Sequence, residues 1–241
     1  YSPIDVNSDT RLLKPSLSYW FGTDELGRDI FTRLIYGTRI SVGIALISII
    51  LAAVIGTFIG AFSGFVGRWP DQLIMRFTDV MLAFPTLVLA LALAAALGAS
   101  MINAAIAITI VKIPIYMRLA RNQALSISQK LYVKAARTNG LKTLWIVRKH
   151  VVPNLITPIV VQVSLDIGDG ILLIATLGFL GLGAQAPTPE WGAMISTGWN
   201  YLINQWWYPT FTGLAIFITV MAFNIIGDGV RDLLDPKAGE K

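Results

Sequence analysis

Asp166 and Asp169 are the residues most able to carry chemistry, because they fall inside an apolar run at about residues 155–180. A spacing of three places both carboxylates on one helical face. Carboxylates at membrane depth are costly, and they mark a water-lined path or a partner charge. Two interpretations stay open. The pair lines a translocation path for a cationic cargo, such as a peptide amino group or a divalent metal, or it has a structural role in a helix loosened by Gly168 and Gly170.

A second candidate segment, residues 132–153, is cationic and lies between apolar runs. It holds small residues at Ala135 and Ala136, a glycine at Gly140 and a proline at Pro153. Glycine can supply the positive φ of a sharp turn, and proline forces a helix to yield or begin anew. The pattern predicts a helix, a turn and a second helix. A polar segment of this kind between two spans is a place for another protein to dock.

The sequence indicates no catalytic site. It holds neither a Gly-x-x-x-x-Gly-Lys-Ser/Thr phosphate loop nor a Gly-x-Ser-x-Gly elbow. His150 is the single histidine and there is no cysteine, which excludes a histidine cluster and a thiolate metal site. We therefore expect no catalytic, cofactor-binding or metal-binding residue in this chain. Uphill transport would need energy from a partner or from an ion gradient.

The composition predicts an all-α, polytopic membrane protein. Of the 241 residues, 55% are hydrophobic and only 14% are charged, and the apolar residues are clustered. The net charge of +5 arises from cations that fall between the apolar runs. Orientation in a membrane explains this distribution, and we expect no nucleic-acid partner.

Five apolar runs are long enough to cross the hydrocarbon core, which takes about 20 helical residues. They lie at about residues 40–63, 80–97, 104–117, 155–180 and 212–226. Five spans would place Tyr1 and Lys241 on opposite sides. We expect a sixth span before Tyr1 that is missing from this sequence.

Local features predict how these runs are shaped. Three glycines four residues apart in the first run predict close packing against a neighbouring helix: Gly56, Gly60 and Gly64. Pro85 predicts a kink, not a break, in the second run. Residues 67–79 are expected to form a short polar turn, and residues 30–36 a short interfacial helix.

The charges orient the chain. From Lys112 to Pro153 there are nine Lys and Arg residues and no Asp or Glu, which predicts a cytoplasmic loop. The loop at 182–208 holds Glu190, no cation and a cluster of Trp and Tyr, which predicts an outer loop. Residues 1–39 are then extracytoplasmic.

The motif Lys134-Ala-Ala-x-x-x-Gly140, nine residues, then x-Val-Val-Pro153 resembles the EAA loop of ABC importer permeases. Three further motifs extend the resemblance over nearly the whole chain, to the C-type permease subunit of dipeptide, oligopeptide and nickel importers. They are Gly22-Thr-Asp-x-x-Gly-Arg-Asp29, Gly178-Phe-Leu-Gly-Leu-Gly-Ala-Gln-x-Pro-Thr-Pro-Glu-Trp-Gly192 and Gly227-Asp-Gly-Val-Arg-Asp-x-Leu-Asp-Pro236.

The resemblance implies a type I ABC-importer transmembrane domain at residues 40–241, with a coupling loop at 121–153 and the outer loop at 182–208. It also implies a heterodimer with a second homologous permease, two cytoplasmic ATPase subunits that bind ATP and Mg, and an extracytoplasmic binding protein. The outer loop and residues 22–29 would face that binding protein. Membrane lipid would surround the spans.

The implied ATPase-coupling residues are Lys134, Ala135, Ala136, Arg137, Gly140 and Pro153, with Arg121 as a further charged rim contact. Lys134 stands where the family pattern expects Glu, which puts in doubt a salt bridge from that position to the ATPase. Ala186 stands where this subfamily often has proline.

The resemblance therefore predicts a permease that moves di- and oligopeptides across the bacterial or archaeal cytoplasmic membrane, driven by ATP. One alternative keeps the architecture and changes the cargo to nickel or a chelated metal. A gradient-driven secondary transporter would also use intramembrane carboxylates, but it predicts an internal repeat and no docking loop. A purely structural membrane scaffold is the remaining alternative.

Overall fold

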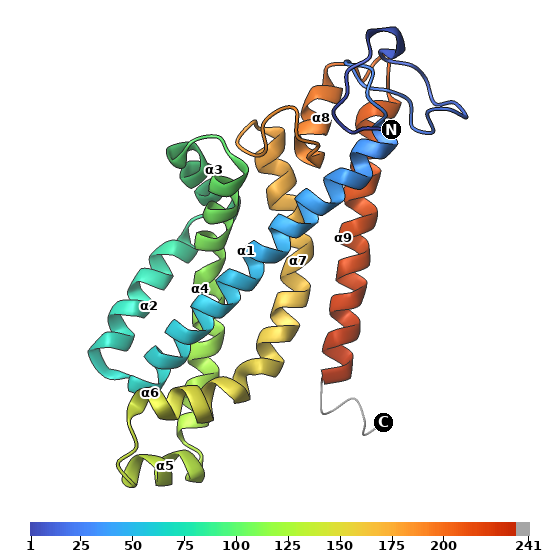
Figure 1. Cartoon of the computed structure of the whole chain (residues 1–241). Coiled ribbons are helices and arrows are strands. Elements are labelled where there is room, and N and C mark those ends of the chain that lie inside the picture. The colour runs from blue at the N-terminus through green and yellow to red at the C-terminus, as the bar shows by residue number, and fades with distance from the viewer. Residues whose placement is uncertain (235–241) are drawn as a thin grey trace. The chain divides into compact units, whose positions relative to one another are not determined.

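The computed structural model describes residues 1–234, which form helices joined by short loops and no named strand (Figure 1). The end of the last sequence motif, Asp235 and Pro236, lies outside the described residues. An isolated bridge pairs Thr23 with Asp29. The prediction of an all-α chain is confirmed for the described residues.

Four helical stretches are long and apolar enough to cross a membrane. They are α1 (Ile30–Val66), α4 (Met101–Ser128), the stretch Thr143–Phe179 and α9 (Trp207–Leu234). A fifth crossing is possible if α2 (Arg68–Ala83) and α3 (Thr86–Leu97) count as one span, although they are bent by 95°. The five predicted spans therefore correspond to four long helical stretches and one bent pair.

The remaining elements are shorter. They are η1 (Ser8–Thr10), α5 (Leu131–Thr138), α6 (Thr143–Ile146), the π-helical η2 (Val147–Val151), η3 (Val152–Leu155), α7 (Ile156–Phe179) and α8 (Trp191–Trp199). The long stretch Thr143–Phe179 thus consists of α6, η2, η3 and α7 in succession.

Two local predictions are wrong. Residues 30–36 are the first turns of α1 and not a separate interfacial helix. Residues 67–79 belong mostly to α2 and not to a turn. The polar residue Asp71 faces inward and is 7% exposed, whereas Trp69 and Phe77 face outward. This inverted amphipathic pattern suits a helix that faces lipid, because its charge is satisfied inside the protein.

The kink predicted at Pro85 is a break. Helix α2 ends at Ala83, and Phe84 is extended, with φ −86° and ψ 141°. Proline disfavours the helical conformation of the residue before it, which explains why the helix stops there. Helix α3 then begins at Thr86 in a new direction.

The chain divides into two compact units. Unit one comprises residues 1–48, 90–108 and 167–225, and unit two comprises residues 49–89, 109–166 and 226–241. Several helices, among them α1, α4 and α7, contribute residues to both units.

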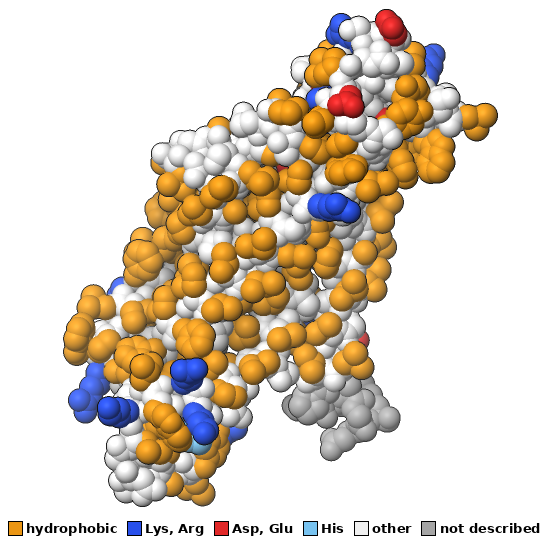
Figure 2. Space-filling model, viewed as in Figure 1, with side chains coloured by type: hydrophobic (Ala, Val, Ile, Leu, Met, Phe, Trp, Pro, Cys, Tyr) orange, Lys and Arg blue, Asp and Glu red, His pale blue; other side chains and the backbone are white. Residues whose placement is uncertain are grey.

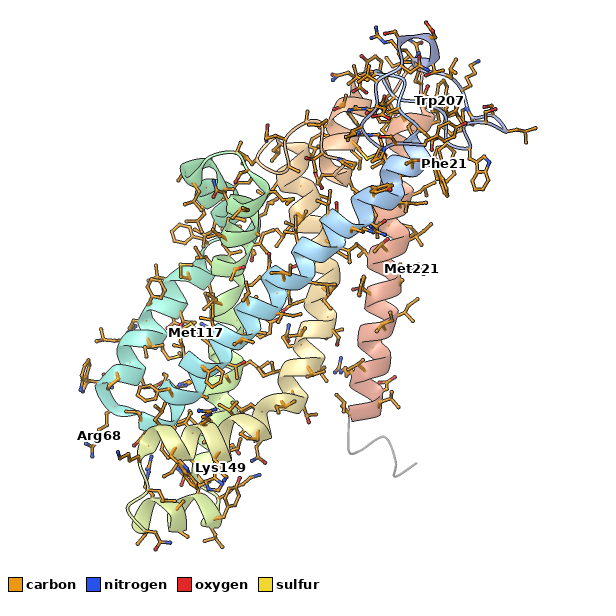
Figure 3. All side chains as sticks on the ribbon, in the orientation of Figure 1. Phe21, Arg68, Met117, Lys149, Trp207 and Met221 are labelled. Carbon is orange, nitrogen blue, oxygen red and sulfur yellow. The ribbon has the colours of Figure 1, made fainter. Side chains whose placement is uncertain are left out.

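Unit two is built on a close contact between α1 and α4. A Cβ at Gly56 would lie 2.7 Å from the carbonyl oxygen of Ile113, and one at Gly64 would lie 2.6 Å from that of Arg121. A Cβ at Gly60 would overlap the carbonyl oxygen of Met117, which Figure 3 labels on α4. The predicted packing role of the glycine stripe is confirmed, because only glycine allows the two backbones to approach so closely.

Unit one packs the N-terminal part of α1 against α8. The fully buried Trp191 donates from Nε1 to the carbonyl oxygen of Leu34 at 3.0 Å, and its ring lies against the backbone at Gly37. At the same end, the rings of Phe21 and Phe211 stack with centroids 4.2 Å apart. Figure 3 labels Phe21 together with Trp207, the first residue of α9.

The glycine stripe gives a direct test of this packing. We expect Gly60→Ala to lower the stability of the protein by about 1–3 kcal/mol, the usual cost of overpacking, because α1 and α4 must separate. Gly43→Ala is the matched control in the same helix, since a Cβ there meets nothing within 4 Å. Thermal unfolding of the purified protein measures both, and equal midpoints for the two variants would contradict the close contact.

Candidate functional site

The segment predicted to dock a partner folds as a helix, a turn and a second helix. Helix α5 ends at Thr138, and Gly140 has φ +74°, which supplies the turn that the sequence predicts. Helix α6 then begins at Thr143. The predicted helix–turn–helix is confirmed for the described residues.

One face of α5 is anchored in the core of unit two. Val133 and Ala136 are 1% and 7% exposed, and they belong to the same cluster as Phe65 of α1 and Ala124 of α4. Arg137 donates from Nη2 to the carbonyl oxygen of Phe65 at 2.8 Å, and its guanidinium lies 4.4 Å from the centre of the Phe65 ring. The small side chain of Ala136 and the charge of Arg137 are thus used within this chain.

The opposite face of α5 is exposed. Lys134 and Ala135 are exposed, and so is Gly140, where an added Cβ would meet nothing within 4 Å. In Figure 2, Lys and Arg side chains lie near α6 and near the lower end of α2. Of the predicted coupling residues, these three present an open, cationic and small-residue surface.

Pro153 lies where the helical geometry changes. The chain is π-helical at Val147–Val151 and 3-10 at Val152–Leu155, before α7 begins at Ile156. Proline lacks the backbone N–H that an α-helix needs at this position, so the hydrogen-bond pattern shifts around it. The prediction that the helix yields at Pro153 is confirmed.

Arg121, expected as a charged rim contact, instead holds α4 to α2. It donates from Nε and Nη2 to the two oxygens of Asp71 at 3.0 and 2.6 Å. Asp71 also accepts from the hydroxyl of Ser63 at 2.5 Å. A bidentate pair of this kind is a strong, directional contact, and it links α1, α2 and α4 within unit two.

Asp166 is the centre of a buried polar network between α4 and α7. One oxygen lies 3.2 Å from Nζ of Lys112, and the other accepts from the hydroxyl of Tyr116 at 2.8 Å and from Nε2 of Gln162 at 3.2 Å. Asp166 is 8% exposed and Lys112 is 2% exposed. These contacts hold α4 to α7, and a place for Asp166 on a translocation path stays a prediction.

Asp169 differs from Asp166 in its exposure. It lies one helical turn further along α7, in the part of that helix that belongs to unit one, and its side chain is exposed. Sequence reasoning paired the two aspartates by their spacing, but it missed Lys112 and Tyr116 as the partners of Asp166. The sequence signal for this pairing was Lys112, a lone cation within the otherwise apolar run at residues 104–117.

The Gly22–Asp29 motif of unit one folds on itself. Asp24 is fully buried and accepts from the backbone N–H groups of Leu26 and Arg28, each at 2.9 Å, and from Nε of Arg28 at 2.6 Å. Gly27 has φ +76°, and a Cβ there would overlap the carbonyl oxygen of Asn7. These motif residues shape the segment and do not present charge to solvent.

Glu190 has a similar structural role in the 182–208 loop. It is 1% exposed and caps α8 by accepting from the backbone N–H groups of Gly192 and Ala193, both at 2.8 Å, and from the hydroxyl of Ser41 at 3.2 Å. Burial raises the pKa of Glu190 above its ordinary value, although the three hydrogen bonds act in the opposite direction. A Cβ at Gly178 would overlap this carboxylate, which explains why the motif at residues 178–192 begins with glycine.

Within residues 1–234, no group of three or more His, Asp or Glu side chains is arranged to hold a metal ion. The described side chains of these sites form ion pairs and a helix cap.

The Lys112–Asp166 pair predicts a specific pattern of stability. Asp166→Asn removes the carboxylate that lies 3.2 Å from the buried ammonium of Lys112, and we expect it to lower the free energy of unfolding by about 3–5 kcal/mol. Lys112→Met combined with Asp166→Asn removes both charges and should recover most of that loss. Thermal unfolding compares the variants. A double variant that is as unstable as Asp166→Asn alone would contradict the pairing. An Asp166→Asn variant that is stable but fails to transport would favour a role of Asp166 in a translocation path.

Comparison with known proteins identifies the family. Residues 56–240 match the family described as "Binding-protein-dependent transport system inner membrane component". The chain is 52% identical over 241 residues to the probable D,D-dipeptide transport system permease protein DdpC of Escherichia coli K12, covering 100% of this chain and 81% of that one. It is 47% identical to the dipeptide transport system permease protein DppC of Alkalihalophilus pseudofirmus, covering 97% and 77%.

A glutathione transport system permease protein, GsiD of Pectobacterium atrosepticum, is 44% identical, covering 92% of this chain and 74% of that one. Among solved structures, an inward-facing MetNI methionine ABC transporter matches with a TM-score of 0.67 and 17% identity, covering 86% of this chain and 98% of that chain. This likeness shows the type I ABC-importer fold. The chain therefore belongs to the family of binding-protein-dependent transport system inner membrane components, as a multi-pass protein of the bacterial inner membrane.

Proposed function

We propose that this chain is the permease subunit of an ATP-driven importer that moves di- and oligopeptides across the inner membrane. Residues 132–153 couple it to a separate ATPase. The observation that carries the proposal is the geometry of α5, which is anchored on one face and open on the other. Family membership supplies the transport role, and a gradient-driven transporter is not supported.

The anchored face of α5 makes it suited to transmit force. Val133 and Ala136 pack with residues of α1 and α4 and with the segment that leads into α7. Close-packed protein interiors have low compressibility, so a displacement of one packed side chain is transmitted to its neighbours. A partner that moves α5 through its exposed Lys134 and Ala135 would therefore act on the helices of unit two.

The partners follow from this arrangement as part of the same proposal. Two cytoplasmic ATPase subunits hold ATP and Mg and meet the permeases at their coupling segments. A second, homologous permease completes the membrane domain. An extracytoplasmic binding protein delivers cargo to the opposite side, where residues 22–29 and the 182–208 loop would face it.

Peptide is the cargo that the relatives favour. The names of three similar permeases specify D,D-dipeptides, dipeptides and glutathione, which are all short peptides or peptide-like molecules. The nickel alternative is not favoured, because the three relatives are named for peptides or glutathione and none of them for nickel. Asp169 is the exposed member of the two aspartates, and we propose it as a contact for a peptide amino group.

Coupling can be tested with two matched glycines. Gly140 and Gly67 both have positive φ, 74° and 63°, and an added Cβ meets nothing within 4 Å at either position. Gly67→Trp carries a backbone cost of its own, because φ 63° with ψ −152° lies in a region essentially restricted to glycine, but only Gly140 lies in the proposed docking surface. We expect Gly140→Trp to keep basal ATP hydrolysis in the reconstituted transporter while peptide uptake falls at least about tenfold, a loss equivalent to about 1.4 kcal/mol of coupling.

In the same assay, Gly67→Trp should transport as the wild type does. Equal uptake by the two variants would refute the coupling assignment. The cargo is tested separately on the wild-type complex by adding a dipeptide, glutathione or nickel and recording ATP hydrolysis. Stimulation by nickel alone would overturn the peptide proposal and leave the coupling result standing.

A further inference from the structure

A cationic hollow opens on unit two where α6 leads into η2 and η3. It has a volume of about 410 Å³ and is lined by Trp145, Arg148, Lys149 and Pro153, all of them exposed. The ammonium group of Lys149 lies 5.4 Å from the centre of the Trp145 ring. Figure 3 labels Lys149 in this segment. The hollow thus combines two positive charges with an aromatic ring.

An apolar groove of about 340 Å³ lies nearby in the same unit, between α1 and α7. Its walls are formed mainly by half-exposed aliphatic and aromatic side chains, which include Ile50, Val54, Phe58, Ile156 and Val160. The groove also contains Thr57, whose buried hydroxyl has no hydrogen-bond partner. Its chemistry suits a hydrocarbon chain that carries an acceptor near one end.

The hollow and the groove follow one another along the same helical stretch. Trp145, Lys149 and Pro153 recur every four residues, and the groove residues Ile156, Val160 and Val163 continue at intervals of three and four. Within α7, side chains at these intervals share one helical face, and the neighbouring residues Val152 of the groove and Pro153 of the hollow join the two sites immediately before this helix. In unit two, Phe65 belongs to one core cluster with Val151 and Leu155, and Val163 packs against a second cluster that contains Ile49. Helix α1 therefore runs antiparallel to this stretch.

The two charged residues that line the hollow, Arg148 and Lys149, are both cations. No Asp or Glu occurs between Lys112 and Pro153, so an occupant of the hollow that balances Arg148 and Lys149 must be anionic. Cationic segments beside a span face the cytoplasmic leaflet, and tryptophan favours the depth of the headgroups.

We propose that unit two binds one anionic phospholipid of the cytoplasmic leaflet. Its phosphate lies against Arg148 and Lys149 beside Trp145, and one acyl chain fills the groove between α1 and α7. The hydroxyl of Thr57 donates to an ester carbonyl of this chain. A soluble protein would satisfy the charges of the hollow but would leave the apolar groove open, which is why the observations favour a lipid. The hollow lies within the proposed coupling segment, residues 132–153, but it does not include the exposed α5 residues Lys134 and Ala135, and the proposal does not depend on the cargo.

The test uses the complete purified transporter in nanodiscs that contain dioleoyl phosphatidylglycerol or dioleoyl phosphatidylcholine. These lipids have the same acyl chains and differ in headgroup charge. Native mass spectrometry counts the lipid that stays bound after extraction. We expect retained phosphatidylglycerol, and Arg148→Gln with Lys149→Gln should lower its affinity roughly thirtyfold, the loss of two cations near an anionic lipid.

Two controls keep the experiment decisive. Arg68→Gln with Arg76→Gln removes two exposed cations of α2 in the same unit, and it should leave retention unchanged. Val160→Trp fills the groove and should lower retention without any change of charge, whereas Val80→Trp, at another exposed valine of unit two, should not. Equal retention of the two lipids, equal effects of the two double variants, or no retained lipid in the wild-type complex would each overturn the proposal.

Discussion

The structure depends on the pairing of charges that would otherwise lie unpaired at membrane depth. Asp166 is held by Lys112, and Asp71 by Arg121, in each case across two helices of unit two. An unpaired charge at this depth is expensive, so each pair fixes where its two helices must meet. The ion pairs determine which helices are neighbours, and the glycines of α1 determine how close α1 and α4 approach.

The packing of unit two connects α5 to the membrane-spanning helices. A short helix at the end of a loop would ordinarily be free to move by itself, but α5 contributes Val133 and Ala136 to a core that includes α1, α4 and the start of α7. Arg137 adds a hydrogen bond and a cation–π contact to Phe65. We infer that a displacement of α5 is carried by a contiguous packed network, which is the physical basis of coupling between a docking surface and membrane helices.

Sequence reasoning succeeded where the signal lies within one segment. The apolar runs, the cationic loop, the glycine stripe of α1 and the turn at Gly140 all follow from local spacing and composition. It failed where the decisive partner is distant in sequence. Arg121 lies 50 residues from Asp71 and Lys112 lies 54 residues from Asp166, so neither the inward face of α2 nor the pairing of Asp166 could be deduced.

The candidate site shows the same limit. The motif identified the small residues of α5, but it did not indicate that Ala135 is exposed while Ala136 is packed in the core. That difference depends on how α5 rests on Phe65 and its neighbours, which is a tertiary contact. The break at Pro85 has a local cause, because proline disfavours the helical conformation of the residue before it, and Phe84 is extended.

The measurement that tests the account most directly is cysteine cross-linking between α5 and the ATPase subunits. The chain has no cysteine, so Ala135→Cys and Ala136→Cys each introduce a single thiol into this chain, and the ATPase would carry single cysteines on its membrane-facing surface. The account predicts cross-links from position 135 and none from position 136. Equal linking from both positions, or linking from position 136 alone, would contradict the proposed docking face of α5.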